Sequence, residues 1–189
     1  MSFNHGNHKL ISTTNPQTFP ASADDNPGPL LEAVYREIYR DRMAGLPIVN
    51  PALEVEAYDF ARFGGFWLGV LITPWFMNLI LLPGESPLPQ LAEGKSQSWL
   101  FPCGSIRFVA GFENGVGPHQ VCSLFSPMGV FPDQAQARAA AKAALETLST
   151  ASGQAAPEVP AGQEADGVRA SKRNFLRSFI PGGRRESGR

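Results

Sequence analysis

Residues 63–84 read FGGFWLGVLITPWFMNLILLPG, a run of 22 residues that contains no charged side chain. About 20 apolar residues can cross a bilayer, so its length alone would permit a transmembrane helix. Pro74 at its centre lacks the N–H that a helix interior needs, and the β-branched and aromatic residues on either side favour strands. The run therefore predicts two strands, each buried on both faces, that are interrupted at Thr73 and Pro74.

Regular patterns on both sides of this run predict helices and further strands. Asn26 and Pro27 are typical of a helix start, and Gly45 of its end. Leu53, Val55 and Ala57 alternate with Glu54, Glu56 and Tyr58, which predicts a half-exposed strand with its acids in solvent. The segments 106–112 and 121–125 indicate further strands that form an antiparallel pair, and 99–103 is a short apolar piece that ends at Gly104. Asp133 and Gln136 fit a capping box before an alanine-rich helix that ends near Thr150.

These elements predict an α+β fold, in which an antiparallel sheet of about five strands packs against an N-terminal and a C-terminal helix. The expected organisation is a disordered segment at 1–26, one domain at 27–150, a flexible linker at 151–168 and a basic tail at 169–189. The last 22 residues carry seven basic side chains and one acid, a net charge of +6. The other nine basic side chains face sixteen acids, a net of −7, so the body should attract cationic segments.

The sequence gives no positive sign of catalysis. It contains no nucleophile motif, no phosphate-binding glycine loop and no zinc-binding HExxH, so we expect a non-catalytic protein without a cofactor or resident metal. No apolar segment follows a basic start at the N-terminus, which favours a cytoplasmic location. We expect neither a nucleic-acid partner nor an integral membrane protein. One chemical alternative stays open, a metal or redox role for Cys103, Cys122 and His119.

The basic tail contains a short motif at residues 171–177, SKRNFLR. It is similar to the S-R-R-x-F-L-K core of a twin-arginine export signal, although Lys172 stands in place of the first arginine. An export signal needs this core near the N-terminus with an apolar stretch behind it, so the tail is not itself one. The residues that carry the similarity are Ser171, Lys172, Arg173, Phe175, Leu176 and Arg177. A solvated basic tail, or one that contacts an anionic membrane surface, is the alternative.

Several segments in order resemble one known family. They are VEAYDFARFGGFW, GVLITPWFMNL, LLPG, FPCG and CSLFSPM, within residues 31–131. The chain resembles the HybE-type assembly chaperones of nickel-iron hydrogenases, which include proteins called HupJ and HoxT. The resemblance implies a cytoplasmic, non-catalytic chaperone. Its partner would be the hydrogenase small subunit, whose export it delays until maturation is complete, alongside other maturation proteins.

The small subunit of these enzymes carries a twin-arginine signal peptide, which is the part that we expect the chain to bind. Acids of the body would hold the arginines of the signal, and apolar residues of the sheet its hydrophobic part. The tail motif could occupy the same groove and be displaced by the signal. The expected contact residues are Trp75, Phe76, Met77, Asn78, Ser123, Ser126 and Met128, with Glu54 and Glu56 as weaker candidates for the arginines.

Overall fold

A computed structural model describes residues 26–150. The helices are α1 (Gly28–Ile38), its π-helical continuation η1 (Tyr39–Met43), and α2 (Gln134–Ser149). The strands are β1 (Glu56–Phe63), β2 (Phe66–Ile72), β3 (Met77–Pro83), β4 (Ser96–Phe101), β5 (Gly104–Glu113) and β6 (Gly117–Phe125). The predicted segment before residue 26, the linker and the basic tail lie outside the described residues.

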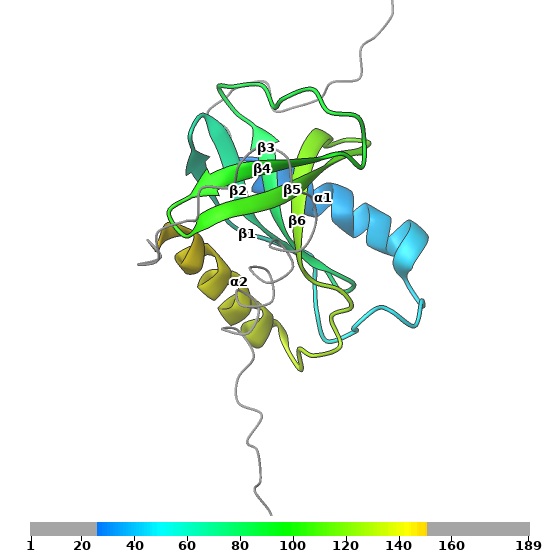
Figure 1. The fold of residues 1–189 in the computed structure, drawn as a ribbon. Helices are drawn as coiled ribbons and strands as arrows, with labels where there is room; N and C mark the ends of the chain where they lie inside the picture. The colour runs from blue at the N-terminus through cyan, green and yellow to red at the C-terminus, as the bar shows by residue number, and fades with distance from the viewer. Residues whose placement is uncertain (1–25, 151–189) are drawn as a thin grey trace, which may run out of the picture.

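The strands form one antiparallel sheet in the order β1-β2-β3-β6-β5-β4 (Figure 1). The predicted α+β architecture is confirmed, with six strands in the described part of the chain where about five were expected. The sixth is β4, which was not predicted as a strand and which begins three residues before the short apolar piece at 99–103. Each helix packs on its own face of the sheet, so the molecule has three layers (Figure 1).

The two strands of the uncharged run, β2 and β3, contribute side chains to both hydrophobic cores. Val70 and Ile72 of β2 pack into the α2-side core with the alanines of α2. Leu71, between them, packs into the α1-side core with Leu31 and Tyr35 of α1. Strand side chains alternate between faces, so two covered faces require apolar residues at every position. The prediction of two doubly covered strands is confirmed, and no helix within residues 26–150 is long and apolar enough to span a membrane.

Of the two helices described, only α2 has the side-chain cap that the sequence predicts, because the N-cap of α1 is Pro27, one residue after Asn26. The Asn26 Oδ1 atom accepts a hydrogen bond from the Gly28 N–H at 2.8 Å, and the Asp133 Oδ1 atom accepts one from the Gln136 N–H at 2.8 Å. Such hydrogen bonds satisfy backbone donors that have no partner in the first turn of a helix. The first helical stretch ends before Gly45, whose φ of 82° favours glycine.

The first strand differs from its prediction. Leu53 packs into the α2-side core and Val55 into the α1-side core, so they do not share a face as the alternation implied. The reason is local, because the Leu53 N–H donates to the Asn50 carbonyl in a turn and β1 begins only at Glu56. Within β1 the register shifts near Asp59, whose φ is 50°. The alternation in the sequence therefore began before the strand did.

Candidate partner-binding site

Strands β3 and β6 bring the two predicted contact segments together. Asn78 pairs with Ser123, and Met77 pairs with Phe125, with a register shift between the two pairs. The segments ITPWFMN and CSLFSPM are 50 residues apart in the sequence, yet they lie side by side in the middle of the sheet. Opposite residues on paired strands have Cβ atoms about 5 Å apart, so Asn78 and Ser123 form a continuous surface.

The predicted contact residues divide into core and surface. Met77 and Met128 are fully buried and Trp75 is 8% exposed, so these three side chains shape the site from beneath. Phe76 and Asn78 are half-buried, while Ser123 and Ser126 are exposed. The side-chain Oδ1 atom of Asn78 is buried without a hydrogen-bond partner among the described residues, which leaves an acceptor for an incoming donor.

The turn at residues 73–76 explains why Trp75 and Met77 do not share a face. The Thr73 hydroxyl oxygen accepts from the Phe76 N–H at 2.9 Å, and the Thr73 N–H donates to the Phe76 carbonyl at 2.8 Å. This bonding takes Trp75 out of the strand and into the α1-side core, whereas Met77 points into the α2-side core. Trp75 and Met77 therefore face opposite sides of the sheet, although they are only two positions apart in the sequence.

Two ring contacts join this turn to the first helix. Trp75 stacks on Tyr39 of η1 with ring centroids 6.2 Å apart, and Phe76 meets Tyr35 edge-on at 5.8 Å. Aromatic pairs in these geometries add about 0.5–1.5 kcal/mol beyond the burial of their area. The turn thus fixes the position of α1 and η1 relative to β3.

A single asparagine, Asn50, ties the turn to two loops, one of which holds the predicted contact residues Ser126 and Met128. The Asn50 N–H donates to the Pro74 carbonyl at 2.8 Å. The Asn50 amide nitrogen Nδ2 donates to the carbonyls of Met128 at 3.1 Å and Phe131 at 2.7 Å. Three segments far apart in the sequence therefore meet at one end of the sheet.

A hollow of about 500 Å³ at this end is lined by residues 47–51 of one loop and by Pro127, Gly129, Phe131 and Pro132 of the other. Three apolar side chains in these loops are exposed: Ile48 by 44%, neighbouring Leu46 by 45% and Val130 by 69%. We call residues 46–51 and 126–132 the loop surface. Exposed apolar groups around a concavity are typical of a protein-binding surface. Its signal in the sequence was the string LPIVNP after Gly45, in which apolar residues fall between prolines.

The two candidate arginine contacts differ in what they already bind. The Glu56 carboxylate accepts from Arg138 Nε of α2 at 2.7 and 2.8 Å and from Gln134 Nε2 at 2.6 Å. It therefore fastens α2 to β1. The Glu54 side chain is exposed, and its backbone N–H donates to Gln134 Oε1 at 3.0 Å. Of the two, Glu54 presents the more accessible carboxylate.

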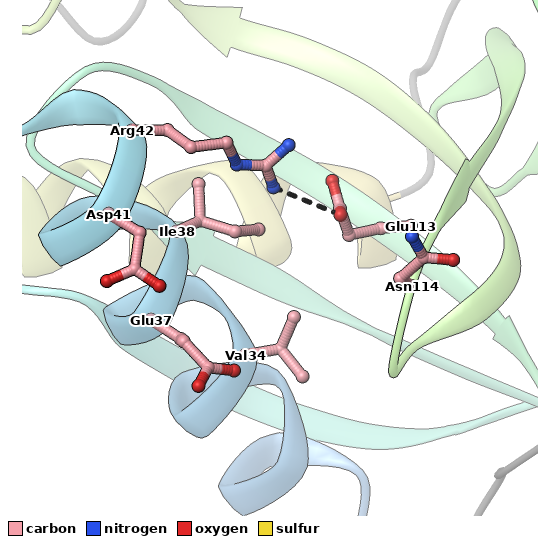
Figure 2. Close-up of a pocket in the computed structure, with 7 residues that line it drawn as sticks. All are labelled: Val34, Glu37, Ile38, Asp41, Arg42, Glu113 and Asn114. Carbon is pink, nitrogen blue, oxygen red and sulfur yellow. Dashed lines mark hydrogen bonds and ion pairs between the residues drawn. The ribbon is translucent and has the colours of Figure 1, made fainter.

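A second concavity lies between the first helix and the turn after β5, and we call it the helix–turn cleft. Figure 2 shows Val34 and Ile38 directed from α1 towards Glu113 and Asn114, with Arg42 of η1 reaching across to Glu113. The cleft encloses about 260 Å³. The Arg42 guanidinium lies 3.1 Å from the Glu113 carboxylate. Glu37 and Asp41 complete the helical wall, so the cleft combines an apolar floor with three acids.

Glu113 is the central charge of this region. Burial raises the pKa of Tyr35 to about 12, and the negative charge of Glu113 contributes to the increase while Arg42 opposes it. Burial lowers the pKa of His119, although its contact with the Gly117 carbonyl and the charge of Glu113 act in the opposite direction. Glu113 therefore faces two buried polar rings as well as the cleft. Neither Glu113 nor Arg42 was anticipated, because residues of a helix and of a distant turn have no shared pattern in the sequence.

The three residues of the metal alternative do not come together. Cys122 packs against the α2-side core, whereas its neighbour Val121 packs against the α1-side core. His119 lies on the Val121 face of β6, opposite to Cys122. Cys103 packs against the α2-side core, and burial raises the pKa of its thiol. No three His, Cys, Asp or Glu side chains within residues 26–150 are placed to hold a metal ion.

Comparison with known proteins agrees with this architecture. The sequence model of the family described as "NiFe-hydrogenase assembly, chaperone, HybE" matches residues 26–178. The hydrogenase expression/formation protein HupJ of Bradyrhizobium diazoefficiens is 41% identical over 153 residues, which cover 81% of this chain and 88% of that protein. The protein HoxT of Cupriavidus necator is 42% identical over 142 residues, covering 69% and 76%.

The fold is also that of a solved structure. The solution structure of HybE from Escherichia coli matches with a TM-score of 0.55 and 28% identity, over 74% of this chain and 87% of that one. The chain is thus of the class of hydrogenase assembly chaperones. It belongs to the HybE family.

Proposed function

We propose that the chain is a non-catalytic chaperone that binds the twin-arginine signal region of a nickel-iron hydrogenase small subunit and delays its export until maturation is complete. The proposal extends the family assignment, which establishes a hydrogenase assembly chaperone. We expect it to act in the cytoplasm, before the signal is used, and alongside other maturation proteins. The observation that carries the proposal is the apolar loop surface, with the exposed Glu54 carboxylate near the end of its second loop.

A twin-arginine signal joins a cationic segment to an apolar one, and the site offers a counterpart for each. Ile48 and Val130 on the loop surface supply apolar contact area. Burying one such side chain contributes about 1.5–3 kcal/mol, which is tenfold or more in affinity. Glu54 near the loop surface and Glu113 in the separate helix–turn cleft supply carboxylates, which bind guanidinium groups with two parallel hydrogen bonds.

The buried residues among the predicted contacts have a supporting role in this proposal. Met77 and Met128 hold the strand ends beneath the surface, and Trp75 holds the turn against η1. The remaining candidates for direct contact are Phe76, Asn78, Ser123 and Ser126. The unpartnered Asn78 Oδ1 atom would accept a hydrogen bond from an arginine or a backbone N–H of the signal.

The test is a titration of a labelled twin-arginine signal peptide into the full chain, followed by anisotropy. Ile48→Asp and Val130→Asp should each weaken binding by at least tenfold, because each places a charge where the apolar part of the signal docks. Leu100→Asp is the matched control, since Leu100 is 79% exposed on the edge strand β4. A peptide in which both arginines are lysines should also bind more weakly. Equal affinity of the three variants and the unmodified chain would refute the loop surface as the binding site.

A further inference from the structure

The helix–turn cleft holds its charges in ion pairs that are easily exchanged. The Arg42 side chain is 56% exposed and the Glu113 side chain 24% exposed, with 3.1 Å between the paired atoms. On the helical wall, Arg40 lies 3.4 Å from Glu37 and 2.9 Å from Asp41. Exposed ion pairs contribute about 0–1 kcal/mol, so another guanidinium can replace Arg42 on Glu113 at little cost.

The chain itself contains a segment of complementary chemistry. Residues 169–189 carry a net charge of +6, and the motif SKRNFLR places aromatic and aliphatic side chains among its basic residues. In an extended chain, side chains two positions apart point to the same side, which groups Arg173, Phe175 and Arg177. That order, basic then apolar then basic, matches a cleft whose apolar floor lies between carboxylates.

The length of chain beyond the described residues is sufficient for this contact. Twenty residues, 151–170, separate Thr150 from the motif. Fully extended they span about 70 Å, whereas a domain of this size has a radius of gyration of about 14 Å. The match to the family extends to residue 178 and so includes the whole motif. Any point on the surface of the domain is therefore within reach of the tail.

We propose that residues 171–177 dock in the helix–turn cleft of their own chain, with Arg173 on the Glu113 carboxylate in place of Arg42. Phe175 then packs on Val34 and Ile38, and Arg177 faces the acids of the helical wall, Glu37 of α1 and Asp41 of η1. This inference rests on the proposed function in one respect. Docking of the tail matters most if a signal peptide also binds the Glu113 carboxylate and has to displace the tail from it. Attachment to the same chain gives the tail an effective concentration on the millimolar scale, so the signal must compete with it.

The first experiment measures amide hydrogen exchange in the full chain. Arg173→Gln/Arg177→Gln should increase exchange in the β5–β6 turn at residues 113–116, because the docked segment no longer covers it. Arg184→Gln/Arg185→Gln is the matched control, since it removes the same charge from the tail outside the motif and should leave exchange in the turn unchanged. The same exchange in all three chains would overturn the docking. This outcome does not depend on whether any signal peptide binds.

The second experiment measures the affinity of the twin-arginine signal peptide for the same three chains. The Arg173→Gln/Arg177→Gln chain should bind at least fivefold more tightly, and the control should bind as the unmodified chain does. Adding Glu113→Gln should abolish the gain, whereas Glu146→Gln on α2, an exposed acid near Lys142, should preserve it. Equal affinities in all chains would overturn competition by the tail. Absence of binding to every chain would instead contradict the proposed function and leave the exchange result to decide the docking.

Discussion

At the scale of single residues, close packing determines which residue type fits at a position, and this cannot be inferred from composition. Gly69 lies in the middle of β2, and a Cβ atom built on it would lie 2.5 Å from the ring of Phe60 on β1. The ring fills the space above the glycine and belongs to the α1-side core. The sequence predicted a buried strand around Gly69. It could not predict the ring, because the register shift in β1 decides which residue faces the glycine.

The Gly69→Ala substitution should therefore destabilise the protein by about 1–3 kcal/mol, the usual cost of overpacking a well-packed core. Gly129→Ala is the matched control, because an added Cβ there meets no atom within 4 Å and the residue has no positive φ. Urea unfolding gives both free energies. An equally small effect of the two substitutions would contradict the packing described for β1 and β2.

His119 makes stability depend on pH. Burial lowers its pKa in the folded protein, against opposing effects of the Gly117 carbonyl, Glu113 and Glu93. The unfolded chain therefore binds more protons than the folded one below pH 6.5, and the free energy of unfolding falls as pH decreases through and below that value. The contribution is fully present when the unfolded imidazole is neutral, above pH 6.5.

Unfolding free energies at pH 7.5 and 5.5 test this effect. The unmodified chain should lose more stability between the two than His119→Gln does, because glutamine does not titrate. Carboxylates contribute equally in both chains and cancel in the difference. The same loss in the two chains would mean that His119 has an ordinary pKa in the folded state.

At the scale of elements, the sequence predicted helices and strands correctly where its pattern was regular. The uncharged run predicted β2 and β3, Asp133 was correctly predicted as the cap of α2, and Asn26 and Pro27 predicted the start of α1 to within one residue. The segment around Leu53 failed, because an alternating pattern does not distinguish a strand from the turn before it. The loop surface was predicted only at Ser126 and Met128, and the rest was missed for another reason. Its shape depends on contacts of Asn50 with carbonyls about 80 residues away, which no local pattern records.

Asn50→Ala tests whether these contacts hold the loops together. The substitution leaves the carbonyls of Met128 and Phe131 without their side-chain donor in a half-buried site, at a cost of about 1–3 kcal/mol. Amide exchange should also increase at residues 126–132. Asn114→Ala, in the exposed turn of the helix–turn cleft, is the control and should change stability by less than about 0.5 kcal/mol. Unchanged exchange in Asn50→Ala would show that the loops keep their arrangement without this residue.

At the scale of the whole molecule, different parts of the sequence form the cores of the sheet and the loops at its end. Its two cores fix the helices on opposite faces, and the loops at one end remain free to present apolar side chains. The α+β fold followed from the sequence, whereas the pairing of β3 with β6 was not predicted. The helix–turn cleft was not predicted either, because it joins Arg42 and Glu113 across 71 positions of the chain. Tertiary packing alone creates that site.

The most direct test of the account compares two forms of the hydrogenase small subunit as ligands of the full chain. The precursor carries its twin-arginine signal, and the second form begins after it. Biolayer interferometry should give at least tenfold tighter binding of the precursor, with the difference reduced in Ile48→Asp and preserved in Leu100→Asp. Equal binding of the two forms would contradict recognition of the signal and move the contact to the mature part of the subunit.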